Sequence, residues 1–459
     1  MNETPRMLDA VIVGAGIAGL AAAWALRHRD ILVLESSDRV GGKMMSLPRE
    51  PYWLNLGAHL LGGPETVMGA LADDLGVETC AVPGNRMGLA LKGRILTSGK
   101  AETYPLRLPL SLAGRLSFIR AGIKLRRITA TFLRAFAEEQ AGRPAAMAQF
   151  RARYGPVSVA QYLGRLHPDV HGIFSAITER VAAPPEDLSI AACASLFAMV
   201  WGGADKLARN VVGGSARLPE AIAQRIGNRM MLDATVVSVE EEGGSVRVVY
   251  RTGHRETVVR ARHAIVATPA HVTHGIVRGL TPETEAALAW LPYGAFYCAA
   301  ILTDETGPMP WDDVYALALA DRSFGMLFNH ANVVRAPGRR ERGGSLMVYA
   351  GGERARALFD LSDGEIRERF LADLYDLYPE ARGIVREVVI QRWQNAVPFA
   401  RPGRHALQGA LEAPQGRVHL AGDYFAIAAN MEMAATTGQR AAAAVEAELK
   451  AVSAPVPGG

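Results

Sequence analysis

One stretch near the N-terminus constrains the fold of this chain more than any other: residues 11–20 read VIVGAGIAGL. An apolar strand is followed by three glycines, Gly14, Gly16 and Gly19, and by the start of a helix. The first glycine permits a tight turn, the second lets a phosphate approach the backbone, and the third lets helix and strand pack closely. The helix start adds unpaired N–H groups and the positive end of the helix dipole. The stretch therefore predicts a strand–turn–helix unit that holds the pyrophosphate of a dinucleotide.

A second predicted strand, residues 30–35, ends in an acid at a suitable distance from this turn. Glu35 follows Gly19 by 16 residues (35 − 19), close to the spacing of about 20 at which an acid binds an adenosine ribose. Strand, turn, helix and acid together make a chance glycine pattern improbable. Three further residues are predicted to line the nucleotide: Ala15, Ala18 and Ser36.

Length and composition limit what the rest of the chain can be. At 459 residues it is too long for one ordinary core, which predicts two interwoven domains. A net charge of +4, from 50 basic and 46 acidic residues, argues against a nucleic-acid-binding protein. Three widely spaced cysteines support neither a disulfide framework nor a metal site. With polar first residues and no apolar run long enough to span a bilayer, we expect a cytoplasmic protein.

After Glu35 the chain continues SSDRVGGK, and residues 54–61 read LNLGAHLL. Together with the glycine turn, these motifs resemble the flavin amine oxidase superfamily. That group holds protoporphyrinogen oxidases, carotenoid- and squalene-type desaturases, monoamine oxidases and the Rab GDP-dissociation inhibitors. The resemblance implies bound, non-covalent FAD, with these residues along its pyrophosphate and ribityl chain: Arg39, Gly41, Gly42 and Lys43. It places three more beside the isoalloxazine ring: Gly57, Ala58 and His59.

A second signal lies near the C-terminus, where AGD at residues 421–423 is followed by MEMAATTG at residues 431–438. Both resemble the closing flavin motif of the same superfamily. The resemblance implies that Gly422 and Asp423 contact FAD, with Asp423 on the ribityl hydroxyls. It also implies that the helix beginning near Met433 directs N–H groups at the ring, where reduced flavin carries negative charge. By the same resemblance, the backbone of Val236 lies against adenine.

Three positions depart from the amine-specific pattern of the superfamily. Cys298 stands where many amine oxidases carry a lysine that holds a water at flavin N5, and Ala396 and Asn430 stand where monoamine oxidases carry two tyrosines. The candidate catalytic residues are therefore Cys298, near N5, and His59, the one titratable side chain that the resemblance puts near the ring. His59 either polarises a substrate or takes a proton, or it is a hydrogen-bonded structural histidine. No metal site is predicted.

Chain order and resemblance together predict an α/β fold: a Rossmann-type FAD-binding domain with a parallel sheet, interwoven with a mixed α+β substrate-binding domain. We expect the FAD-binding domain at residues 8–75, 207–280 and 393–450. We expect the substrate-binding domain at residues 76–206 and 281–392, with a helical part at 107–200, and a flexible tail at 451–459. Within the second domain, strands are expected at 297–302, 323–330 and 345–350, a helix at 360–377, and a solvated basic loop at 335–342.

One predicted helix has an unusual surface. Residues 107–134 contain seven basic residues and no acid, and Leu112, Leu116, Ile119 and Ile123 recur at the spacing of a single helix face. We expect this apolar stripe to pack on the protein's own core while the charges lie in water. The second interpretation is a helix that makes peripheral contact with a membrane surface.

The sequence thus predicts an FAD-dependent oxidoreductase that dehydrogenates or oxidises a fairly apolar small molecule by hydride transfer to flavin N5. Oxygen or a quinone would accept the electrons, and the protein would stand nearer the desaturase and protoporphyrinogen oxidase branch. An alternative is an amine or amino-acid oxidase with a non-standard pocket. A third is a non-catalytic binder like the GDP-dissociation inhibitors, against which the second glycine pair and the C-terminal motif argue.

Overall fold

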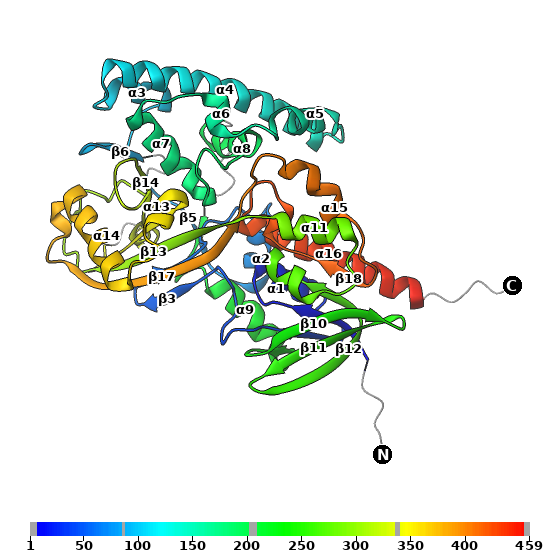
Figure 1. Cartoon of the computed structure of the whole chain (residues 1–459). Helices are drawn as coiled ribbons and strands as arrows, with labels where there is room; N and C mark the ends of the chain where they lie inside the picture. Colours follow the sequence, from blue (N-terminus) through cyan, green and yellow to red (C-terminus); the bar gives the residue numbers. More distant parts are fainter. Residues whose placement is uncertain (1–6, 85–87, 202–208, 336–339, 454–459) are drawn as a thin grey trace.

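A computed structural model describes residues 7–84, 88–201, 209–335 and 340–453. Two seven-stranded sheets form its framework, and a layer of helices lies along the top of the molecule in Figure 1. The predicted α/β class is confirmed, because parallel strands and flanking helices build the first sheet while the second is mostly antiparallel.

The first sheet carries the glycine turn. Its strand order is β10–β11–β12–β1–β2–β9, with β18 also paired to β12. The strands are β1 (Leu8–Val13), β2 (Ile31–Leu34), β9 (Met230–Met231), β10 (Thr235–Glu242), β11 (Ser245–Thr252), β12 (Arg255–Val266) and β18 (Val418–Leu420). In β1, Ala10, Val11 and Ile12 are all fully buried, as expected for a parallel strand covered on both faces. The sheet is therefore built from segments that lie hundreds of residues apart.

Helices pack on the first sheet and around the N-terminal glycine turn. They are α1 (Ile17–Ala25), α2 (Val67–Leu75), α9 (Arg217–Ile226), α10 (Ala270–Ile276), α11 (Pro282–Trp290), α15 (Gln408–Glu412) and α16 (Met431–Ser453). Helix α16 packs on α1 so closely that a Cβ at Gly438 would come within 2.0 Å of the carbonyl oxygen of Ala18. Helix α16 reaches Ser453, so residues 451–453 of the expected tail are helical, and residues 454–459 lie outside the described residues.

The second sheet has the order β17–β13–β16–β15–β14–β6–β7. Its strands are β6 (Gly88–Leu91), β7 (Arg94–Leu96), β13 (Tyr293–Thr303), β14 (Ala316–Leu319), β15 (Met326–Asn329), β16 (Gly344–Gly351) and β17 (Val385–Pro398). The expected antiparallel strands are therefore present as β13, β15 and β16. Short elements complete this region: β3 (Ser46–Arg49), β4 (Tyr52–Asn55), β5 (Thr79–Ala81), β8 (Arg209–Val211), α12 (Ala331–Arg335) and α13 (Gly352–Ala357).

The helix expected at residues 360–377 is α14 (Asp363–Leu377), and its start follows the predicted capping chemistry. The Ser362 side chain accepts the Glu365 N–H, and the Glu365 carboxylate accepts the Ser362 N–H. The buried residues Ile366, Phe370 and Leu374 pack α14 onto the second sheet. The prediction of this helix is confirmed. It could be made from the sequence because capping and periodicity both depend on residues a few positions apart.

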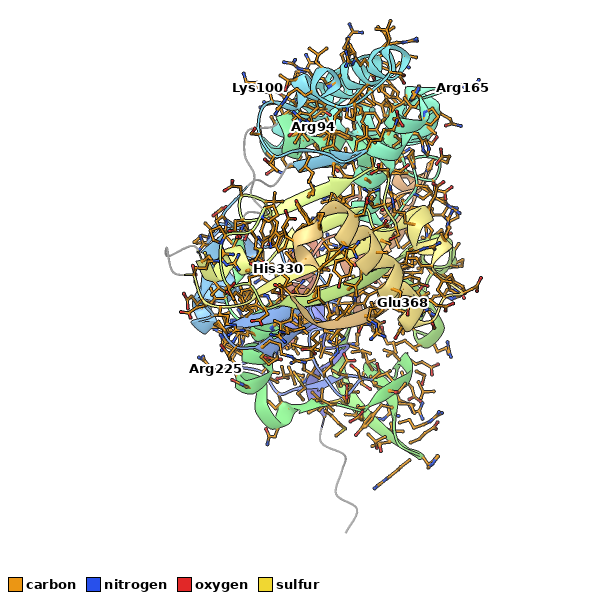
Figure 2. The ribbon with its side chains drawn as sticks, turned by 90° about the vertical axis from the view of Figure 1, so that its left-hand side faces the viewer. Arg94, Lys100, Arg165, Arg225, His330 and Glu368 are labelled. Carbon is orange, nitrogen blue, oxygen red and sulfur yellow. The ribbon has the colours of Figure 1, made fainter. Side chains whose placement is uncertain are left out.

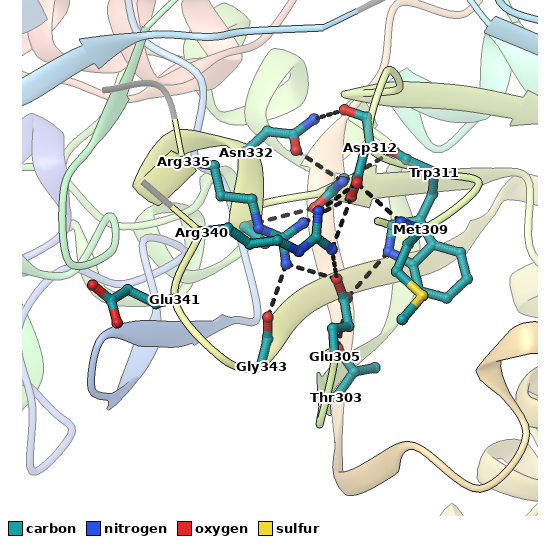
Figure 3. A network of polar contacts seen from close by, with 12 residues as sticks. Thr303, Glu305, Met309, Trp311, Asp312, Asn332, Arg335, Arg340, Glu341 and Gly343 are labelled. Carbon is teal, nitrogen blue, oxygen red and sulfur yellow. Dashed lines mark hydrogen bonds and ion pairs between the residues drawn. The ribbon is translucent and has the colours of Figure 1, made fainter. Parts of the chain in front are cut away.

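The basic loop expected in solvent is partly an internal ion-pair network, shown in Figure 3. Arg335 donates to Glu305, which is fully buried, at 2.6 Å, and Arg340 donates to the same carboxylate oxygen at 3.0 Å. Thr303 and Trp311 donate to the other oxygen of Glu305 at 2.8 and 3.1 Å. The interpretation of residues 335–342 as a solvated loop is therefore wrong for Arg335, which ends α12 and is largely buried. Arg340 is exposed although it joins the network, and residues 336–339 lie outside the described residues.

The helical layer contains α3 (Tyr104–Arg107), α4 (Leu112–Gln140), α5 (Ala145–Tyr154), α6 (Val159–Leu163), α7 (Pro168–Thr178) and α8 (Ile190–Trp201). Helix α4 buries Ala121, Leu125 and Ile128, and it turns the predicted stripe outward. Leu112, Leu116, Ile119 and Ile123 are 75%, 56%, 40% and 48% exposed. The expectation that this stripe packs on the core is therefore wrong, because a neighbouring face of the same helix makes the core contact.

Among the described residues, no helix combines the length and the apolar character that crossing a membrane requires.

Candidate active site

The glycine turn leaves open space where a phosphate is predicted to bind. Gly14 has a φ of +96°, which favours glycine, and a Cβ at Gly19 would lie 1.9 Å from the Gly14 carbonyl oxygen. A Cβ at Gly16, in contrast, would meet nothing within 4 Å. The first and third glycines are therefore required by the fold itself, whereas the second faces an unfilled space beside the start of α1.

The second glycine pair completes the same cradle. The Gly41 N–H donates to the Ala15 carbonyl at 2.8 Å, and a Cβ at Gly42 would approach the Gly16 Cα to 3.3 Å. Gly41 and Gly42 have φ values of +95° and +54°, so this backbone path also favours glycine. Two motifs that are separated in sequence thus form one backbone surface around the open space.

The carboxylate of Glu35 is fixed at the end of β2, beside the turn. It accepts the Ala15 N–H at 2.6 Å, the Ser37 N–H at 3.0 Å and the Ser36 hydroxyl at 3.3 Å. Val236, on β10, is 8% exposed and packs in the core cluster that contains Leu34. Glu35 and the turn are therefore adjacent, as the ribose-binding prediction requires.

Two cations and the C-terminal acid line the cradle. The Lys43 ammonium lies 3.1 Å from the Asp423 carboxylate, which joins the N-terminal motif to the A-G-D segment. Arg39 donates to the carbonyls of Val40 and Gly42 at 3.2 and 2.8 Å. Its guanidinium also lies over the Trp393 ring, 5.7 Å from the ring centre. The residues present fit a dinucleotide flavin, because backbone N–H groups, cations and an acid converge on one open space.

The C-terminal motif has a role that the sequence did not reveal. The Glu432 carboxylate accepts the N–H groups of Val67 and Met68 at 2.7 and 3.0 Å, so it caps the start of α2. The Met433 N–H, predicted to face the flavin ring, donates to the Asn430 side chain at 2.9 Å. The Gly422 N–H donates to the Thr437 hydroxyl at 3.0 Å. In this structure Asn430, which stands at a predicted tyrosine position, therefore caps α16.

His59 lies in a buried, largely aromatic environment. Its Nδ1 is 3.0 Å from the Gly57 carbonyl and 3.1 Å from the Asn55 amide nitrogen. Its Nε2 is buried without a partner among the described residues. Gly57 itself has no room for a side chain, since a Cβ would lie 2.1 Å from the Lys43 carbonyl, and the Ala58 N–H donates to that same carbonyl. The local backbone thus sets the position of the imidazole.

His330 is a partner of His59 that the sequence did not indicate. The two rings meet edge to face with centres 4.7 Å apart, and both nitrogens of His330 are buried without partners among the described residues. His330 is 1% exposed, and its label lies between the helical layer and the first sheet in Figure 2. Burial lowers the pKa of His59 to about 4 and that of His330 well below its usual value. Both rings are therefore neutral at neutral pH, and three of their nitrogens are buried without a hydrogen-bond partner among the described residues.

We expect the free energy of unfolding to fall as the pH drops from 6.5 towards 4. In this window the unfolded chain takes up protons on both histidines, whereas the folded protein keeps His59 and His330 neutral. Urea unfolding at several pH values measures the effect. His330→Phe, which removes one buried imidazole, should make the decline shallower. His254→Asn, at an exposed turn after β11, should leave it unchanged. An identical decline in wild type and His330→Phe would contradict this explanation.

Cys298 lies inside the second sheet rather than at an exposed edge. It pairs in register with Tyr349 on β16 and Gln391 on β17, and it is 3% exposed. Burial raises the pKa of its thiol to about 12. The thiol is therefore protonated at neutral pH and does not replace lysine as a charged group.

An apolar cavity of about 250 Å³ lies beneath α4. Its walls come from α4, α7 and α8 on one side and from β6, β14 and β15 on the other. Arg180 is a cation in this lining, and its guanidinium forms no hydrogen bond or ion pair within the described part of the chain. The charge of Arg180 lowers the pKa values of both His59 and Tyr349. Neither of these two side chains is itself among the residues that line the cavity.

One group of side chains in the described ranges has the composition of a metal site. The ligand atoms of His263, His419 and Glu448 all lie within 4.8 Å of one another. The sequence predicted no such group, because these residues belong to β12, β18 and α16 and meet only in the folded chain. His59 is not part of it, so it does not bear on the candidate active site.

Comparisons with known proteins match this geometry. A family model described as flavin containing amine oxidoreductase matches residues 17–446. AofH of Mycobacterium tuberculosis, a relative named for flavin-containing monoamine oxidase activity, is 30% identical over 59% of this chain. The alignment spans 58% of that relative, a little over half of its length. Chloroplastic protoporphyrinogen oxidase 1 of Spinacia oleracea is 24% identical over 89% of this chain and 78% of its own.

A solved structure shows the same fold. Cyclohexylamine oxidase from Brevibacterium oxydans IH-35A superposes with a TM-score of 0.76 at 23% identity, over 97% of this chain and all of the other. The family match begins just after Gly16 and covers Gly19, the second glycine pair at Gly41 and Gly42, and the A-G-D segment. The chain therefore belongs to the flavin-containing amine oxidoreductase family.

Proposed function

We propose that this protein oxidises or dehydrogenates an elongated, mostly apolar molecule that binds in the cavity beneath α4. The observation that carries the proposal is the cavity itself, whose lining is mostly aliphatic and aromatic and includes Arg180, the cation whose charge acts on the pKa of His59. Apolar lining with a few placed polar groups is typical of small-molecule sites. The lysine and paired tyrosines of the amine oxidases are absent from the matching positions, Cys298, Ala396 and Asn430.

In this proposal, one set of residues would bind the cofactor and another would bind and orient the substrate. The two glycine motifs, with Glu35, Arg39, Lys43 and Asp423, would hold FAD without a covalent bond. When bound, FAD supplies the redox chemistry by accepting a hydride from a carbon of the substrate, and oxygen or a quinone would reoxidise it. The apolar cavity would exclude water, and neutral His59 would orient a polar group of the substrate or accept a proton from it.

The test is anaerobic reduction of the purified yellow protein, followed as bleaching of the flavin absorbance. The panel contains tetrapyrroles and isoprenoids, with simple amines and amino acids for comparison. We expect bleaching by an apolar member and none by short amines. A protein that remains colourless after addition of FAD would contradict the enzyme assignment, and bleaching by short amines alone would contradict the apolar substrate.

A second candidate, oxidation of an amino acid with a large apolar side chain, is favoured by Arg180. A guanidinium without a partner in an apolar cavity suits a carboxylate, to which it can donate two parallel hydrogen bonds. The apolar walls would then hold the side chain of the substrate. The same position of Arg180 also suits an apolar substrate of another class that carries an acid group.

Replacing Arg180 with leucine is expected to lower kcat/KM for a carboxylate-bearing substrate roughly ten- to a hundredfold. This is the effect expected from losing a hydrogen bond to a charged group. The effect should fall mainly on KM, because the guanidinium binds and does not react. Steady-state kinetics with the acid and its neutral amide distinguish this role, since the amide should change little. Arg165→Leu, at an exposed site in the helical layer, is the matched control. Equal losses for acid and amide would contradict the role.

A further inference from the structure

The outward face of α4 carries an exposed apolar stripe, Leu112, Leu116, Ile119 and Ile123, and the segment around it holds most of the exposed large apolar side chains of the described structure. Ten such side chains are exposed, and six of them lie between residues 106 and 136. They are Leu106, Leu112, Leu116, Ile119, Ile123 and Phe136. Contiguous exposed apolar surface of this kind usually marks an interaction site. Because α4 lies along the top edge of the molecule in Figure 1, nothing in the described fold covers it.

Arginines flank this apolar stripe, and no acid lies near it in sequence. Arg120 and Arg127 fall along one edge of the stripe and Arg126 along the other, at 3.6 residues per turn. All three are exposed, and residues 107–137 contain no Asp or Glu. Of the three, Arg126 alone forms an ion pair in the described structure, with Glu102 at a long 3.8 Å. The face therefore combines apolar side chains with unbalanced positive charge.

The apolar cavity reaches the same face. Ile119 and Ile123 belong both to the exposed stripe and to the cavity lining. At the other end the cavity is lined by Met326 on β15, which pairs in register with Tyr349 on β16. The apolar lining thus extends from the outer surface of α4 to Met326 on β15 of the second sheet.

We propose that the outward face of α4 docks on the surface of an anionic lipid bilayer, with the mouth of the cavity at the interface. The leucines and isoleucines would enter the boundary between headgroups and acyl chains, and Arg120, Arg126 and Arg127 would pair with lipid phosphates. An apolar substrate would then pass from the lipid into the cavity without crossing water. Delivery of substrate rests on the proposed function, whereas docking does not.

A second copy of the chain is a poorer occupant of this face. A symmetric contact through the same patch would bring the arginines of one copy close to those of the other. With no acid in residues 107–137, neither copy supplies a partner for these charges. Like-charge contacts oppose association, whereas anionic lipid neutralises both edges of the stripe.

The test is co-sedimentation of the FAD-loaded full-length protein with vesicles, in low and in high salt. Vesicles of phosphatidylcholine mixed with phosphatidylglycerol should bind the protein, and vesicles of phosphatidylcholine alone should bind it much more weakly. Arg120→Gln/Arg127→Gln should reduce binding by roughly fivefold for each arginine. Leu112→Gln/Leu116→Gln should reduce it at least about tenfold, because neither leucine can then enter the interface.

The control is Val258→Gln/Phe359→Gln, which removes two exposed apolar side chains elsewhere and should leave binding unchanged. Absorbance of bound FAD shows that each variant is folded. Equal binding by wild type and Leu112→Gln/Leu116→Gln, or no binding of wild type to either vesicle, would overturn the proposal. A dimer in light scattering that Leu112→Gln/Leu116→Gln converts to monomer, without vesicle binding, would assign the face to a second copy instead. Bleaching by soluble substrate should persist in all these variants, which separates failure of docking from failure of the proposed function.

Discussion

Replacing Gly16 with valine is expected to give a folded protein that has lost its yellow colour. A Cβ at this position meets no protein atom within 4 Å, so the fold has room for the side chain. The same space is where the pyrophosphate would have to approach the backbone, and a valine there would exclude it. We expect FAD affinity to fall by at least roughly a hundredfold, about 2.7 kcal/mol.

The measurement is the flavin-to-protein absorbance ratio after purification and after titration with FAD, together with circular dichroism. Gly19→Ala is the matched comparison, because a Cβ there would lie 1.9 Å from the Gly14 carbonyl oxygen. That variant should fail to fold or lose stability whether or not FAD is present. Retention of FAD by a folded Gly16→Val protein would refute the placement of the cofactor.

Replacing Arg335 with methionine is expected to lower the free energy of unfolding by about 3 kcal/mol or more. The change leaves the fully buried Glu305 carboxylate with one cation instead of two, because Arg340 remains at 3.0 Å. The cost arises because a buried carboxylate loses one of its two cationic partners and is then only partly compensated. Chemical denaturation of the two proteins at the same pH and FAD concentration measures it.

Two further variants test the cause. Arg342→Met breaks the ion pair between Arg342 and Asp304, in which the Arg342 side chain is 70% exposed. This change should lower the free energy of unfolding by about 1 kcal/mol or less. Glu305→Gln/Arg335→Met should recover part of the loss, since it removes the unpaired charge as well. If Arg335→Met lowered the free energy of unfolding no more than Arg342→Met does, the network around Glu305 would not be a major source of stability.

The local elements of the fold could be predicted because their causes lie within a few residues. The capping box of Ser362 and Glu365 and the apolar runs of β13 and β16 depend on neighbouring residues. The glycine turn belongs to the same class, since the left-handed φ of Gly14 is a property of the backbone itself. Such features appear in the structure at or near the predicted positions.

The candidate site was only partly predictable, because several of its residues meet through tertiary packing. His59 was indicated by its motif, but its partner His330 follows β15 in the second sheet and carries no motif. Arg180 became notable only when the cavity showed a cation without a partner. Glu432 lies in a flavin motif, yet its carboxylate caps α2.

Helix α4 also has one feature that the local sequence sets and another that tertiary packing sets. Periodicity correctly predicted a helix with an apolar stripe from Leu112 to Ile123, but a stripe has no intrinsic direction. A second, less obvious face with Ala121, Leu125 and Ile128 packs on the core and leaves the stripe exposed. Which face is buried depends on the shape of the neighbouring helices, which no local pattern encodes.

The sequence by itself therefore determined the dinucleotide turn, the acid at the end of β2 and the flavin motifs at both ends of the chain. These are set by backbone conformation and by residue types that must stand at short, fixed spacings. The tertiary structure decided that Lys43 meets Asp423, that His59 meets His330, and which face of α4 is exposed. The physical reason is that burial and partner choice depend on contacts between segments far apart in the chain, which form only when the two sheets and the helical layer pack together.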